Sequence, residues 1–76
     1  MDPYARIASI AAILPMNRAD FAKALHVSPA RLYGWLAVAR GDELPARHAG
    51  RVPPDAEILR RADELRLDHA RAVAAA

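Results

Sequence analysis

Histidine, serine and paired carboxylates often carry out chemistry in proteins, but none of them is suitably spaced for it in this chain. His26, His48 and His69 are scattered along the sequence, and no cysteine is present. Metal sites need such ligands at short helical or turn spacings. Asp63 and Glu64 are adjacent on a predicted helix, so their side chains point in different directions. We expect that the chain is not an enzyme and that it holds no metal and no cofactor.

Basic residues form the other chemically notable group, and they gather in the middle of the chain. Residues 18–51 contain six of the 11 lysine and arginine residues and three acidic residues. Residues 52–76 contain four arginines and five acidic residues. The formal net charge is only +2, so the distribution of charge is more informative than its size. An excess of basic residues in one segment is compatible with a polyanionic partner.

The length of 76 residues allows one domain, which we expect to span residues 1–76. A domain of this size buries roughly 60% of the surface of its unfolded chain, so its stability is modest. No apolar run approaches the roughly 20 residues that span a bilayer, and the apolar stretch 7–14 lacks the clearly basic segment that precedes the apolar core of a signal peptide. The absence of cysteine fits a cytosolic protein. We therefore expect a cytoplasmic location.

Four helices are predicted, and the first two begin and end at clear signals. Asp2 caps the first helix, Pro3 occupies its first position, and Pro15 ends it. Asn17 caps the second helix. In both helices apolar residues recur at spacings that place them on one face. These residues are Ile7, Ile10, Ala11 and Leu14 in the first helix, and Phe21, Ala22 and Leu25 in the second.

The third and fourth helices follow the same rules. Ser28 caps a helix that starts at Pro29, and Gly41 ends it. Residues 41–54 contain two glycines and three prolines and are predicted to form a connecting loop. Asp55 caps a last helix over about residues 55–73. Since no segment has a strand pattern, we predict an all-α fold, a compact domain of four to five helices. The inner faces are Leu32, Trp35 and Leu36 in the third helix, and Ile58, Leu59, Ala62 and Leu65 in the last.

The stretch 17–38 has the residue pattern of a helix-turn-helix core. Two helices that cross through a short turn need a small residue at the crossing, and Ala22 stands there. Leu25 and Val27 are apolar residues on either side of the turn, and Leu32 and Trp35 anchor the next helix to the core. By this helical spacing we expect Trp35 to be a core residue and not a platform for stacking bases.

This stretch resembles the phage Cro and lambda-repressor-like helix-turn-helix family, including its small Cro- and YdaS-type members. The segment FAKALHVSPARLYGWLA is similar to the family's A-x-x-L-G-V-S…W-L core, and GDELPA is similar to the opening of its following helix. The resemblance covers about residues 17–48 and implies a compact helical fold, no cofactor, and a dimer that binds a palindromic operator. His26 replaces the usual turn glycine, and histidine tolerates the required positive φ better than most residues.

The resemblance implies that the helix after the turn enters the major groove of DNA. Arg31 then suits a guanine edge, Ala30 a thymine methyl, and Tyr33 a phosphate or a base edge, while Gly34 allows close approach. The start of the second helix suits a backbone phosphate. The expected base-facing residues are Ser28, Pro29, Ala30, Arg31, Tyr33 and Gly34, and the expected backbone contacts are Asn17, Arg18, Arg40, Arg47 and Arg51.

These expectations favour a regulator of transcription that binds DNA sequence-specifically and represses by occupying a promoter. The resemblance implies a phage or mobile-element type of protein. Two alternatives remain open from the sequence: a protein-interaction module such as an antitoxin or adaptor, and a structural subunit of a phage or nucleoid assembly. The last helix either closes the core or pairs with a second copy, and the small core favours a homodimer through Leu59, Leu65 and Val73.

Overall fold

Each α-helix begins at the capping residue that the sequence predicts. The computed structural model describes residues 2–76, and in it the side chain of each cap accepts a hydrogen bond from the backbone N–H three residues later. These bonds satisfy amides that the first turn of a helix leaves without a partner. The caps are Asp2, Asn17, Ser28 and Asp55, with donor–acceptor distances of 2.9, 2.8, 3.2 and 2.9 Å.

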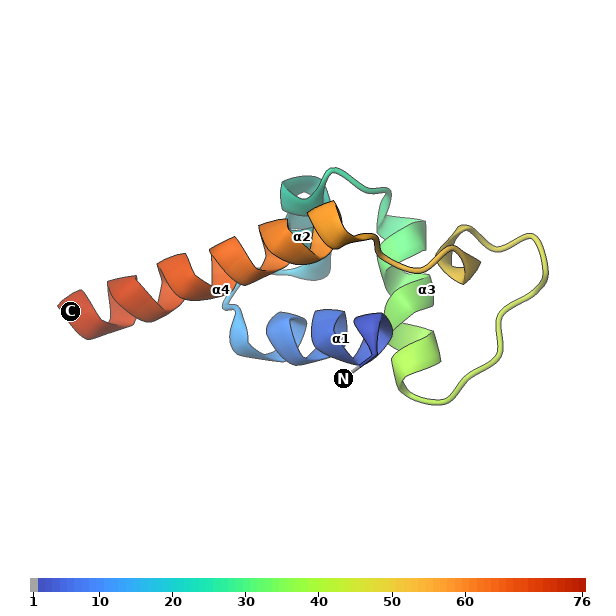
Figure 1. Ribbon diagram of the computed structural model, residues 1–76, viewed down its shortest axis with the longest axis horizontal. Helices are drawn as coiled ribbons and strands as arrows, with labels where there is room; N and C mark the ends of the chain where they lie inside the picture. The colour runs from blue at the N-terminus through green and yellow to red at the C-terminus, as the bar shows by residue number, and fades with distance from the viewer. Residues whose placement is uncertain (1) are drawn as a thin grey trace.

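The all-α prediction is confirmed for the residues that the structure describes. Figure 1 shows α1 and α4 side by side, with α3 crossing near the start of both. A short 3-10 helix, η1, lies in the segment between α3 and α4. The elements are α1 Pro3–Ile13, α2 Arg18–Leu25, α3 Pro29–Ala39, η1 Ala49–Arg51 and α4 Ala56–Ala75.

The core lies where α1, α2 and α3 meet, and the first half of α4 covers it. Trp35 is fully buried, as predicted, and Ile58 and Ala62 of α4 pack onto the same cluster. Full burial of one large apolar side chain, such as leucine, isoleucine or phenylalanine, stabilises the fold by about 1.5–3 kcal/mol. A few such residues are therefore important for the stability of so small a domain. The largest fully buried side chains are Trp35, Phe21, Ile7, Leu25 and Leu32.

A three-residue turn, residues 26–28, joins α2 to α3. His26 has φ 61° and ψ 39°, which is the left-handed conformation expected at this position. The Val27 N–H donates to the Ala22 carbonyl at 3.0 Å and the His26 N–H to the Lys23 carbonyl at 3.1 Å, as in a Schellman motif. Val27 is half-buried against the core. The turn is therefore held by backbone hydrogen bonds and by one apolar anchor.

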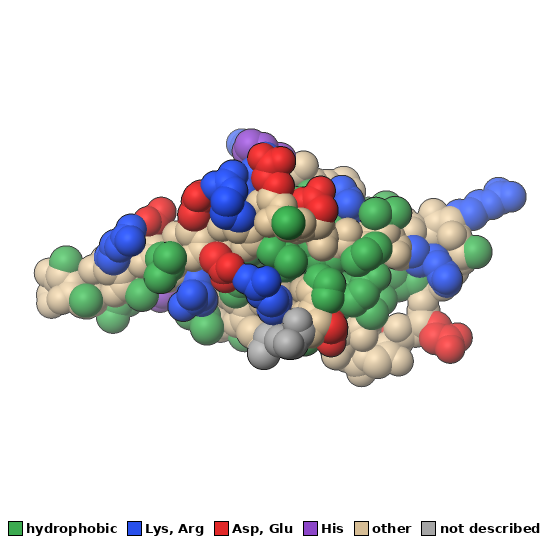
Figure 2. All heavy atoms as spheres, viewed as in Figure 1, with side chains coloured by type: hydrophobic (Ala, Val, Ile, Leu, Met, Phe, Trp, Pro, Cys, Tyr) green, Lys and Arg blue, Asp and Glu red, His purple; other side chains and the backbone are tan. Residues whose placement is uncertain are grey.

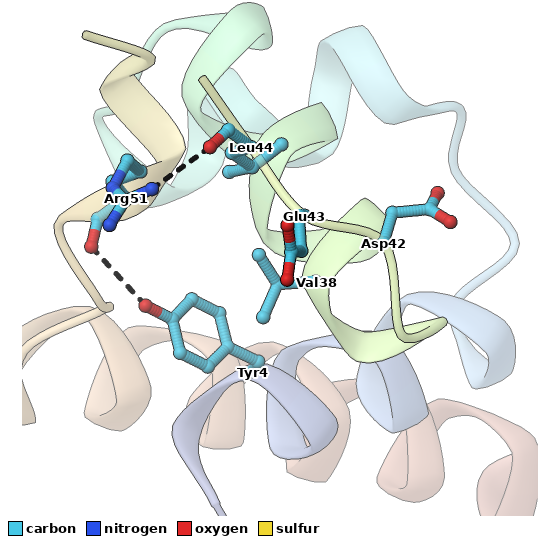
Figure 3. A pocket seen from close by; sticks show the side chains of 6 residues that line it. All are labelled: Tyr4, Val38, Asp42, Glu43, Leu44 and Arg51. Carbon is cyan, nitrogen blue, oxygen red and sulfur yellow. Dashed lines mark hydrogen bonds between the residues drawn. The ribbon is translucent and has the colours of Figure 1, made fainter. Parts of the chain in front are cut away.

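We call residues 41–54 the strap; its first half is largely exposed, and its second half packs against α3 through η1. The indole N–H of Trp35 donates to the Val52 carbonyl at 2.8 Å. The Tyr4 hydroxyl donates to the Arg51 carbonyl at 3.3 Å, and the Arg51 guanidinium donates to the Leu44 carbonyl at 2.9 Å (Figure 3). Tyr4 is thus a half-buried core-edge residue. A hollow of about 400 Å³ lies beneath the strap, lined by Tyr4, Val38, Asp42, Glu43, Leu44 and Arg51.

The second half of α4 projects beyond the body of the molecule (Figure 1). Its first half is tied to α1 by an ion pair between Arg6 and Asp63, and to α2 by Arg61, which donates to the Leu25 carbonyl at 3.3 Å. Residues 70–76 are all exposed, and the helix continues to Ala75, beyond the predicted end near residue 73. Among residues 2–76 no helix is both long and apolar enough to cross a membrane.

Candidate nucleic-acid interface

One face of α3 is open to solvent. Leu32, Trp35 and Leu36 point into the core, and Gly34 lies against the strap. Pro29, Ala30 and Tyr33 are exposed, and Ala37 beside them is half-buried. The Tyr33 side chain is at the centre of this face and is 55% exposed. We call these four outward residues, Pro29, Ala30, Tyr33 and Ala37, the free face of α3.

Arg31 does not project from α3 as expected. Its guanidinium lies over the Trp35 ring, 4.9 Å from the ring centroid, and the residue is half-buried. The two residues are four apart on one helix, so their side chains are neighbours, and the guanidinium gains a cation–π contact. In the unbound protein the guanidinium therefore packs on Trp35 instead of standing free, and the contact of Arg31 with a guanine stays a prediction. The spacing of Arg31 and Trp35 was a signal for this contact.

Gly34 does not face outward from α3, although the sequence predicted that it would. It is buried, and an added Cβ would lie 2.8 Å from the Gly50 Cα and 2.8 Å from the His48 ring. The absence of a side chain therefore serves the packing of the strap on α3, not an approach to DNA. Gly50 is the packing partner of Gly34 that the sequence did not predict, because only the fold shows that these two glycines meet.

Three predicted contact residues come together along one edge of the free face, and one of them, Tyr33, belongs to that face. Arg18, Tyr33 and Arg40 line a shallow hollow of about 290 Å³ between the start of α2 and the end of α3. The Arg18 guanidinium donates to the Ala11 carbonyl at 3.3 Å, which holds it at this position. Arg40 forms an ion pair with Asp42 at 3.2 Å, and its side chain is 68% exposed. Both guanidiniums keep further N–H groups for an anion.

The remaining predicted contacts lie at the ends of helices or on the strap. Asn17 and Ser28 are exposed caps, and each uses a side-chain oxygen to accept a bond from its own helix. Arg47 is exposed, and no ion pair connects it to any residue from 2 to 76. Arg51 is exposed and is held to Leu44. The strap and the hollow thus flank the free face on its two sides.

Charge pairing distinguishes this surface from the rest of the molecule. Of the six basic residues in 18–51, only Arg40 forms an ion pair within the described chain. Every arginine of α4, by contrast, pairs with a carboxylate of the same helix, and Figure 2 shows basic and acidic side chains alternating along it. The positive charge that is not neutralised therefore lies around α2, α3 and the strap.

The described residues contain no cluster of three potential metal ligands. Comparison of the chain with protein-family models, with curated proteins and with solved structures gives no match. The interpretation of this surface therefore depends on its own geometry.

Proposed function

We propose that this chain binds double-stranded DNA sequence-specifically, with α2, the turn and α3 acting as a helix-turn-helix. In this proposal it is a small cytoplasmic repressor of the phage Cro and lambda-repressor-like type, found in phages or mobile elements. The observation that carries the proposal is an open face on the helix after the three-residue turn, flanked by basic side chains that the protein's own acids leave largely unpaired.

The proposed complex follows from the two flanks of the free face. The first turn of α3 enters the major groove, where Pro29, Ala30 and Tyr33 reach base edges. Arg18 and Arg40 bind phosphates on one side, and the exposed Arg47 of the strap binds the backbone on the other. The start of α2 adds backbone N–H groups and the positive end of its dipole. In this arrangement the phosphate contacts set the register and α3 selects the sequence.

Selection of bound duplexes from a random pool, followed by salt titration of the selected site, tests this function. We expect enrichment of a short motif and a binding constant that falls with salt, with a log–log slope of about −0.9 for each phosphate contacted. Arg18→Ala should reduce both affinity and slope, whereas Arg71→Ala on α4, where the arginine pairs with Asp68, is the matched control and should change neither. No enriched motif, or binding independent of salt, would refute the proposal.

We also propose that two copies associate through the projecting half of α4. Of the three residues predicted for this contact, Val73 is 61% exposed, but Leu59 and Leu65 are partly buried and pack against the chain's own core. Ile13 of α1 and Leu67 of α4, at 54% and 43% exposure, are the other exposed large apolar side chains on these two helices. A second copy offers the same helix and the same residues, and a two-fold pair suits a palindromic site. Val73→Glu should shift the sedimentation coefficient from dimer to monomer and weaken binding to a two-half-site duplex. A monomeric parent protein at micromolar concentrations would contradict this arrangement.

A protein-interaction module is the second candidate function, and one observation favours it. Two of the four free-face residues are alanines and a third is proline, so the face is largely apolar. Exposed apolar surface is typical of protein-binding sites. The duplex selection separates the two functions, because an adaptor binds DNA weakly and without regard to sequence.

A further inference from the structure

We infer that the free face of α3 recognises thymine methyl groups, so that the bases it meets are A·T pairs read by van der Waals contact. This inference rests on the proposed DNA-binding function and specifies its substrate. The free face carries no amide, carboxylate or guanidinium side chain; its residues are Pro29, Ala30, Tyr33 and Ala37. Hydrogen-bond recognition of base edges depends mainly on such groups.

The one long polar side chain in the first turns of α3 is held elsewhere. The Arg31 guanidinium covers the Trp35 ring at 4.9 Å, and Trp35 has no exposed surface. If Arg31 swung out to a guanine, it would lose this contact and uncover the ring. The Ser28 hydroxyl, at the start of the helix, is oriented by the bond it accepts from the Arg31 N–H at 3.2 Å. Guanine recognition is therefore not built into this surface.

The groups that do face outward match one feature of DNA. Thymine carries a methyl group in the major groove, which the other three standard bases lack, and alanine is a residue that contacts it. The Ala30 methyl and the Pro29 ring are exposed at the start of α3, where a recognition helix meets base edges. Tyr33 is three residues after Ala30, so the two lie on the same side of the helix, and its ring extends the apolar contact.

The small side chains in the first turn of α3 support the same conclusion. With Pro29 and Ala30 exposed there, the backbone of this turn can approach the base edges closely, which a methyl contact requires, while the Tyr33 side chain extends further out. With α3 this close to the bases, the hollow lined by Arg18, Tyr33 and Arg40 and the strap on the other flank would contact the phosphates of the DNA backbone. The phosphates then provide most of the affinity, and the methyl groups provide the selection.

Replacement of single thymines by deoxyuridine in the selected duplex tests the inference, since it removes the methyl group and keeps every hydrogen-bonding group. We expect about a fourfold loss of affinity at each contacted thymine, the loss for one buried methyl-sized group. Replacing a contacted T·A pair by 5-methylcytosine·G should retain part of the affinity that unmethylated C·G loses. In Ala30→Gly, the difference between thymine and deoxyuridine should disappear at one position and persist at the others.

The outcomes separate this inference from the function it depends on. Specific binding that is equally tight to thymine and deoxyuridine duplexes would overturn methyl recognition and leave DNA binding standing. A selected motif with an essential guanine, whose preference is lost in Arg31→Ala, would also overturn it, because Arg31 would then leave Trp35 on binding. The absence of any selected motif would overturn both, and the apolar face would then be assigned to a protein partner.

Discussion

Arginines occur in both the α2–α3–strap region and in α4, but their partners differ. In α4 each arginine pairs with a carboxylate three or four residues away, as Arg61 does with Glu57 at 3.0 Å. In the α2–α3–strap region the guanidiniums of Arg18 and Arg51 bind backbone carbonyls, and that of Arg31 covers Trp35. Those contacts orient the groups without cancelling their charge. The comparison shows that a modest net charge can conceal one neutralised and one positive surface.

The largest effect is expected where the strap packs on α3, because Gly34 and Gly50 are in close backbone contact there. Gly34→Ala would place a Cβ 2.8 Å from the Gly50 Cα, and two backbones cannot easily move apart without disturbing the core. We expect a loss of about 1–3 kcal/mol in the free energy of unfolding, as for other overpacked sites. Chemical denaturation followed by Trp35 fluorescence measures it, because the indole N–H would also lose its bond to Val52. Gly50→Ala should behave similarly, whereas undiminished stability in both variants would mean that the strap is not packed as described.

Removing one arginine from each region should affect DNA binding differently. Arg47→Ala should weaken binding to all duplexes alike and reduce the log–log salt slope by about 0.9, the amount for one phosphate contact. Arg60→Ala in α4 should leave the slope unchanged, since that arginine is engaged with Glu57 and Glu64. Fluorescence anisotropy at several salt concentrations measures both. A loss confined to one DNA sequence in Arg47→Ala would assign that residue to base recognition instead.

One substitution in the turn between α2 and α3 should stabilise the protein and leave the free face unchanged. His26 has φ 61°, a conformation that costs a residue with a side chain roughly 1 kcal/mol and costs glycine little. We therefore expect His26→Gly to raise the free energy of unfolding by about 0.5–1 kcal/mol. Thermal and urea denaturation at one fixed pH check this. An unchanged or lower stability would indicate that the imidazole makes a compensating interaction.

The smallest effect is expected in α4. Glu57→Gln removes the carboxylate that pairs with Arg60 and Arg61, all on one helix. Exposed pairs of this spacing contribute about 0.2–0.5 kcal/mol each, so the variant should remain close to the parent in urea denaturation and lose even this difference in high salt. A loss above about 1 kcal/mol would mean that α4 depends on its ion pairs more than its packing implies.

Much of the fold was predictable because its signals are local. Asp2, Asn17, Ser28 and Asp55 each bond an amide three residues away, so a short stretch of sequence contains both partners. The apolar spacing that predicted Trp35 as a core residue is also a property of one helix. The candidate site was less predictable. Tyr33 is exposed as expected, but Arg31 and Gly34 are engaged within the protein.

The starts of the helices and the faces they bury were predictable from the sequence alone, because hydrogen bonds and side-chain neighbours within one or two turns fix these features. The positive φ of residue 26 was implied only by the family resemblance, and the structure has it. Only the tertiary structure decided that the strap packs on α3, that Gly34 meets Gly50, and that half of α4 projects beyond α1. Those contacts join residues far apart in the chain, and their geometry depends on how all the helices pack together.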